Sequence, residues 1–249
     1  MPFSKPVISS KHPTVKPQIR PLEMPDALAS DQWGSTLTAD CDDPIIRKAA
    51  EAHGAAYRVW DSLNRARSSK HPDQPLAAHL PKVEHLTRQQ TAKLYARIDQ
   101  CRAELKQRKS ELFTEIKTNA LRNAGDVNLN ETRMAIRSMN KAERVKFLSD
   151  AVLNGESDVV AALMSGTPTQ LGIDREPFER MNRVAAQVTS PHIVALDKRI
   201  DDADNLLLAT VEASIELESQ IAPKAVIDEY ENDVKAYEEA MTNVLNSID

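Results

Sequence analysis

The sequence predicts an all-α protein that has long antiparallel helices with heptad patterning, a subdomain of short helices and an extended N-terminal arm. The 249 residues contain only six glycines and 4% aromatic residues, whereas β-sandwiches and dinucleotide-binding folds need turn glycines and strand-forming side chains. Ala, Leu, Glu, Lys, Arg and Asp dominate the composition, as they do in long helices. Apolar residues also recur at alternating steps of three and four, which indicates helix-on-helix packing.

Residues 1–44 form the expected arm. Six prolines occur in this polar, aperiodic segment before Pro44, and proline fixes φ and removes a hydrogen-bond donor, which favours an extended chain. Residues 1–21 carry four cations and no acid. We expect these cations to contact a neighbouring protein; they are Lys5, Lys11, Lys16 and Arg20.

Residues 45–86 are expected to hold one helix and a proline-rich loop. An Asp N-cap and Pro44 at the first helical position begin the helix, and an apolar stripe follows up to Leu63. Three prolines between residues 70 and 82 then predict a loop.

Residues 87–249 are expected to form the helical body. Thr87 and Gln90 have the spacing of a capping box, which predicts a helix from Thr87 to about residue 123. Short helices should fill an insert at 130–190, where Asn140 is a predicted N-cap and Gly155 a predicted helix end.

The last two predicted helices, 191–221 and 224–248, carry the clearest periodicity. We expect them to form an antiparallel hairpin or bundle with the helix at 87–123, with the apolar positions along the packing line, called the seam below. The seam positions are Ile193, Leu196, Ile200, Ala203, Leu207, Thr210, Ser214, Leu217, Ile221, Ile227, Tyr230, Val234, Tyr237, Met241, Val244 and Ile248. Tyr230 and Tyr237 are candidates for anchoring a partner at the edge of the seam, and core packing is the alternative for both.

Three acids beside the seam, Asp201, Asp202 and Asp204, raise the question of a metal or acid–base site. Adjacent helical residues are rotated by about 100° and do not converge, so we expect a solvated flank and no metal. Residues 82–146 carry 15 Lys and Arg against 8 Asp and Glu, whereas residues 201–249 carry 2 against 13. This asymmetry suggests that the basic middle and the acidic end face each other, within one chain or between copies; the alternative is that each is a solvated helix face.

No catalytic, cofactor-binding or metal-binding residue is predicted. No glutamate has a histidine three residues later, and the sequence lacks the patterns of a nucleophile elbow, a P-loop and a dinucleotide-binding turn. Acids interrupt the basic stretch and few aromatic residues lie in it, which disfavours nucleic-acid binding, although a place beside nucleic acid within an assembly stays open.

The expected location follows from what the sequence lacks. No apolar run approaches the ~18 residues of a membrane span, and the N-terminus has no apolar region typical of a signal peptide. Cys41 and Cys101 lie in unlike contexts, which favours free thiols in a reducing compartment.

Residues 141–220 contain a helix that ends in "AVLNG", the short helix "ESDVVAALMSG", a turn with "LG" and a long helix with Pro191 at its start. In this order of helix starts and stops, the segment resembles small helical proteins encoded among the morphogenesis genes of tailed bacteriophages. The resemblance implies a structural or morphogenesis role and carries no active site.

The sequence thus predicts a non-enzymatic structural component of a multi-subunit assembly. A tailed-bacteriophage virion is the expected assembly, other protein subunits are the expected partners, and a homo-oligomer in the virion or the host cytoplasm is the expected state. The alternative is a soluble regulatory or adaptor protein that binds a partner helix in a groove.

Overall fold

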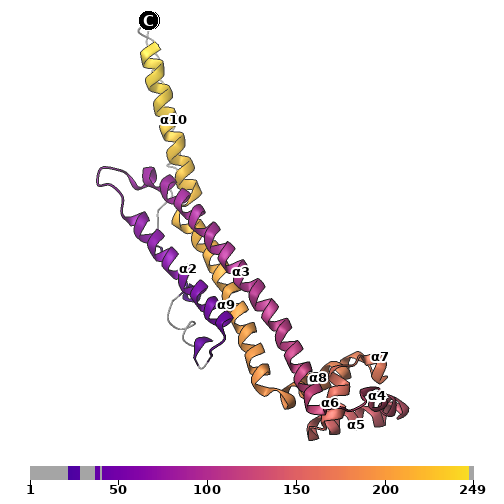
Figure 1. Ribbon diagram of the computed structural model, residues 1–249. Coiled ribbons are helices and arrows are strands. Elements are labelled where there is room, and N and C mark those ends of the chain that lie inside the picture. The colour runs from indigo at the N-terminus through magenta and orange to yellow at the C-terminus, as the bar shows by residue number, and fades with distance from the viewer. Residues whose placement is uncertain (1–21, 29–36, 40, 247–249) are drawn as a thin grey trace, which may run out of the picture. The chain divides into compact units, whose positions relative to one another are not determined.

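The computed structural model describes residues 22–28, 37–39 and 41–246, and every regular element in these ranges is a helix (Figure 1). The predicted all-α class is therefore confirmed. The elements are η1 (Asp26–Leu28), α2 (Pro44–Ser68), α3 (Leu76–Ala124), α4 (Leu129–Ser138), α5 (Lys141–Asn154), α6 (Ser157–Met164), α7 (Pro168–Leu171), α8 (Arg175–Thr189), α9 (Pro191–Ile221) and α10 (Lys224–Asn246). Most of the arm expected at 1–44 lies outside the described residues.

The chain divides into two compact units. Of the described residues, the first contains 22–28, 56–93 and 211–246, and the second contains 37–39, 41–55 and 94–210. Helices α2, α3 and α9 each contribute one segment to each unit, whereas α4 to α8 belong to the second unit and α10 to the first.

In the second unit, α3 and α9 pack antiparallel. Arg102 of α3 bonds Asp204 of α9, and further along α3 the Asn119 amide bonds Ser190, just before α9 begins. Apolar side chains from both segments are completely or almost completely buried, and they include Ile98, Leu105, Ile200, Ala203 and Leu207. The seam positions predicted in this part of α9 are therefore core except for Leu196, which is half-buried, because their spacing of three and four residues brings them onto one face.

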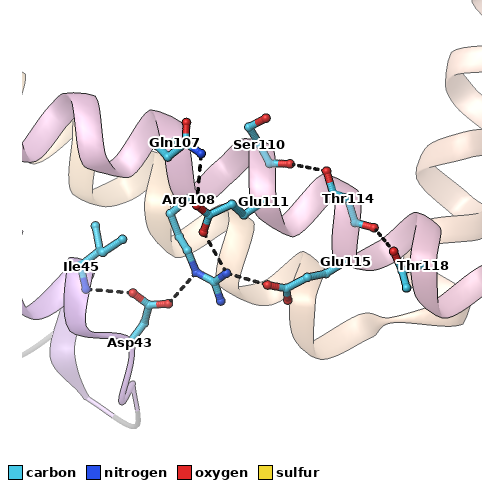
Figure 2. A network of polar contacts seen from close by, with 9 residues as sticks. All are labelled: Asp43, Ile45, Gln107, Arg108, Ser110, Glu111, Thr114, Glu115 and Thr118. Carbon is cyan, nitrogen blue, oxygen red and sulfur yellow. Dashed lines mark hydrogen bonds and ion pairs between the residues drawn. The ribbon is translucent and has the colours of Figure 1, made fainter.

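One carboxylate fixes the start of α2 within this unit. Asp43 Oδ1 accepts a hydrogen bond from the backbone N–H of Ile45 at 2.9 Å, which confirms the predicted Asp N-cap. Its other oxygen accepts from Arg108 Nε at 3.2 Å, and Arg108 also donates to Glu115 at 2.6 Å (Figure 2). A single aspartate thus caps α2 and ties the capped end to α3.

The short helices begin and end through local signals. Asn140 accepts from the backbone N–H of Glu143 at 3.0 Å, and Gly155 ends α5 with φ of 70°, so both predictions are confirmed. After Gly166 the chain forms a four-residue helix, α7, where the sequence indicated a turn. Thr167 begins this helix with a capping box.

Arg144 of α5 holds the ends of two neighbouring helices. Its guanidinium donates to backbone carbonyls of Ile136, Arg137 and Met139 at the end of α4, at 3.0, 2.7 and 2.6 Å. It also donates to the carbonyl of Gly172, which follows α7. The Ile136 carbonyl also accepts from the backbone N–H of Met139. The cation adds hydrogen bonds to carbonyls at the ends of both helices and counters the negative end of the helix dipole.

In the first unit, a buried tryptophan links α2 to α9. The Trp60 indole Nε1 donates to Ser214 Oγ at 2.9 Å, and both side chains are fully buried. The next seam positions of α9, Leu217 and Ile221, are also fully buried.

The predicted start of the long helix at Thr87 was wrong. Helix α3 begins at Leu76 and continues through Pro81, so residues 76–82 of the predicted loop are helical. Thr87 is buried and donates its hydroxyl to the carbonyl of Val83, one turn earlier, instead of capping. Leu80 and Val83 are fully buried, and this packing outweighs the cost of a proline near the helix start.

Candidate interaction surface

The acids beside the seam of α9 are paired with bases of α3. Asp204 accepts two hydrogen bonds from Arg102, at 2.6 and 3.1 Å, and Asp201 accepts from Lys109 Nζ at 2.5 and 2.7 Å. Asp197 lies 3.7 Å from the same lysine. Of the two alternatives for the charged regions, the structure thus shows contact for Asp201 and Asp204, which meet the basic helix α3.

The electrostatics of these pairs are those of ion pairs between two packed helices, in which each carboxylate stabilises the charged form of its base. The bond to Asp204 raises the pKa of the Arg102 guanidinium, and the bond to Asp201 raises the pKa of the Lys109 ammonium. An open groove of about 380 Å³ lies beside them, and its charged lining includes both pairs. Among the residues that the structure describes, no group of three or more His, Cys, Asp or Glu side chains is arranged to hold a metal ion.

His53 is a second buried polar group of the second unit. Thr210 donates its hydroxyl to the carbonyl of Leu206 at 2.8 Å, so its oxygen accepts from His53 Nδ1–H, at 2.9 Å. His53 Nε2 has no hydrogen-bond partner among the described residues, and burial lowers the pKa of the imidazole. A neutral histidine that joins α2 to α9 in this way is a packing element.

The remaining feature is an exposed apolar face on α10, in the first unit. Val226 and Ile227 are buried and Tyr230 is half-buried, but every residue from Lys235 to Leu245 is exposed. Figure 1 shows this part of α10, in yellow, extending away from the other helices of its unit. We define the α10 face as its apolar side chains: Tyr237 (66% exposed), Met241 (47%), Val244 (56%) and Leu245 (66%).

The spacing of these residues places them on one side of the helix. Tyr237, Met241 and Leu245 follow each other at steps of four, and the stripe continues the line of Ile227, which is buried. The α10 face is thus the extension of a core-forming stripe beyond the point where the unit covers it. A helix end of this length is marginally stable in water unless its apolar side is buried.

The structure places the predicted partner-binding residues differently from one another. Tyr237 lies near the start of the exposed stretch, whereas Tyr230 lies where α10 leaves the core of its unit. Lys5, Lys11, Lys16 and Arg20 lie outside the described residues.

Sequence reasoning missed three members of the face. Met241 and Val244 were assigned only to the seam, and Leu245 lies outside the periodic series. The signal that could have found them is the continuation of apolar residues on both sides of position 241, at 237 and 245. The pattern identifies residues that share a face, but it does not say whether the chain itself covers that face.

Comparison with known proteins gave no match: no protein-family model, curated protein or solved structure is similar to this chain. Within the described ranges, no helix has both the length and the apolar character that crossing a membrane requires.

Proposed function

We propose that this chain is a non-enzymatic structural component of a multi-subunit assembly and that it contacts neighbouring protein subunits through the α10 face. The exposure of the apolar stripe from Tyr237 to Leu245 carries the proposal. Exposed apolar side chains gathered on one rigid element are typical of surfaces that bind another protein. An aromatic residue such as Tyr237 is a frequent anchor of such contacts.

The assembly in this proposal is a tailed-bacteriophage particle or one of its morphogenesis intermediates. The resemblance of residues 141–220 to helical morphogenesis proteins supports that choice, and so does a basic N-terminal segment suited to contacting a neighbour. The protein would then be found in the virion or in the host cytoplasm, and other copies of the chain would be among its neighbours.

Sedimentation of the protein in extracts of cells that assemble the particle tests the proposal. We expect the full chain to co-sediment with particles or intermediates far heavier than its own 27.7 kDa. The variant Tyr237→Asp, Met241→Asp should leave the heavy fractions, because a charge on each anchor position removes the apolar contact.

A matched control keeps the charge change but moves it off the stripe. Ala236 and Asn243 are exposed and lie on the opposite side of α10, so Ala236→Asp, Asn243→Asp should remain in the heavy fractions. If the unmodified chain sediments at 27.7 kDa throughout assembly, the structural role is contradicted.

The second candidate is a soluble adaptor that binds one partner helix. The α10 face also favours this function, because a single exposed helical stripe is the kind of surface that pairs with one other helix. The same sedimentation experiment distinguishes the adaptor from the structural component. An adaptor would form a light complex of defined stoichiometry and would not enter the particle fraction.

A further inference from the structure

The borders of the α10 face are acidic on both sides. On the helical projection, Glu231 and Glu238 lie seven residues apart along one border, and Asp233 lies on the other. All three are exposed, and within the part of the chain that the structure describes no ion pair involves them. The lysines of α10, Lys224 and Lys235, lie outside these borders.

These borders disfavour pairing between two copies of α10. In a parallel pair the opposite borders meet, so Asp233 of one copy would face Glu238 of the other. In an antiparallel pair the same borders meet, which places Glu231 and Glu238 against each other. Like charges would therefore face each other in either orientation.

The second unit of the same chain shows what an acid-bordered stripe pairs with. There the acidic border of α9 meets a basic helix: Asp204 bonds Arg102 at 2.6 Å and Asp201 bonds Lys109 at 2.5 Å. The seam positions next to those acids, Ile200 and Ala203, are buried between the same two helices. The α10 face has the same combination of apolar stripe and acidic border, but the unit that contains it does not bury it.

We propose that the α10 face docks an amphipathic helix of another protein of the assembly, with an apolar stripe bordered by Lys and Arg. The inference rests on the proposed function, because it specifies the chemistry of the partner that the α10 face contacts. Charge complementarity at the borders would select the partner and its register, while burial of Tyr237, Met241 and Leu245 would supply most of the affinity.

Binding of two designed helical peptides to the full chain tests the proposal. Both peptides span four heptads with the same leucine stripe, and they differ only in carrying Lys or Glu at every border position. Fluorescence anisotropy should show that the Lys-bordered peptide binds about tenfold or more tightly than the Glu-bordered one. The difference should shrink as salt is added, because the border charges are exposed.

Two double variants with equal changes in net charge separate a docking surface from general attraction. Glu231→Lys, Glu238→Lys should reverse the preference, so that the Glu-bordered peptide binds better. Asp228→Lys, Glu239→Lys changes exposed acids away from the borders and should keep the original preference. Tyr237→Asp should weaken both peptides.

Three outcomes would overturn the inference. The first is equal affinity for the two peptides, and the second is an equal loss of preference in both double variants. The third is a dimer of the full chain that Tyr237→Asp dissolves, which would assign the face to a second copy. If the chain enters heavy particles while the peptides show no preference, the chemistry of the partner is wrong and the structural role stands.

Discussion

The buried bond between Trp60 and Ser214 gives the sharpest test of the packing in the first unit. Replacing Ser214 by Ala removes one hydroxyl and leaves the indole N–H without its acceptor, in a place where both side chains are fully buried. An unsatisfied buried donor costs about 1–3 kcal/mol, whereas the hydrogen bond itself contributes only about 1 kcal/mol net. We therefore expect Ser214→Ala to lower the free energy of unfolding by about 2 kcal/mol.

A double-mutant cycle with Trp60→Phe isolates that effect. Phe lacks the N–H, so no donor remains to be left unsatisfied, and Ser214→Ala in this background should cost less than about 0.5 kcal/mol. Urea unfolding followed by circular dichroism at 222 nm measures all four proteins, because the signal does not depend on the tryptophan that is changed.

The coupling energy between the two substitutions shows whether the Ser214 hydroxyl is the acceptor for the Trp60 indole N–H. The expected difference between the two backgrounds is about 1–2 kcal/mol. Equal costs of Ser214→Ala in the presence and absence of the indole would show that the hydroxyl does not serve the indole, and the reasoning about α2 and α9 in this unit would fail.

Three further predictions concern the second unit. Burial lowers the pKa of His53 from 6.5, so on acidification the unfolded chain takes up a proton that the folded chain does not. The free energy of unfolding should therefore fall as the pH drops below about 6.5. Over the same pH range, the urea midpoint of His53→Gln should fall less than that of the unmodified protein. Leu207→Asp places a charge at a fully buried position and should lower the free energy of unfolding by several kcal/mol, which circular dichroism would detect as loss of helical signal on mild heating. Asp204→Asn, on the half-exposed flank of the same helix, should lower it by about 1 kcal/mol or less. Arg144→Ala should lower the free energy of unfolding by about 2–3 kcal/mol, and Arg144→Lys by nearly as much, because one ammonium cannot reach carbonyls on two helices. Hydrogen exchange should be faster at the end of α4 in both variants, and unchanged protection there would contradict this role of Arg144.

The sequence by itself determined the class of fold and the local signals that begin and end several helices. The periodicity of α9 identified Ile200 and Leu207 as core, and Asn140 and Gly155 marked the ends of α5, because these features depend on residues within a few turns of each other. The charge balance left open whether the acids of α9 meet the bases of α3 or stay solvated, and the structure decided this for Asp201 and Asp204.

Tertiary structure decided the features that depend on residues far apart in the chain. Thr87 has the sequence of a cap, but burial of Leu80 and Val83 extends the helix through Pro81 to Leu76. The heptad-like stripe of α10 is uniform in sequence, yet Ile227 is core and Tyr237 is surface, because the neighbouring helices of the unit bury only the beginning of α10. Periodicity fixes which side chains share a face, whereas the lengths and positions of the packed helices fix how much of that face is left for a partner.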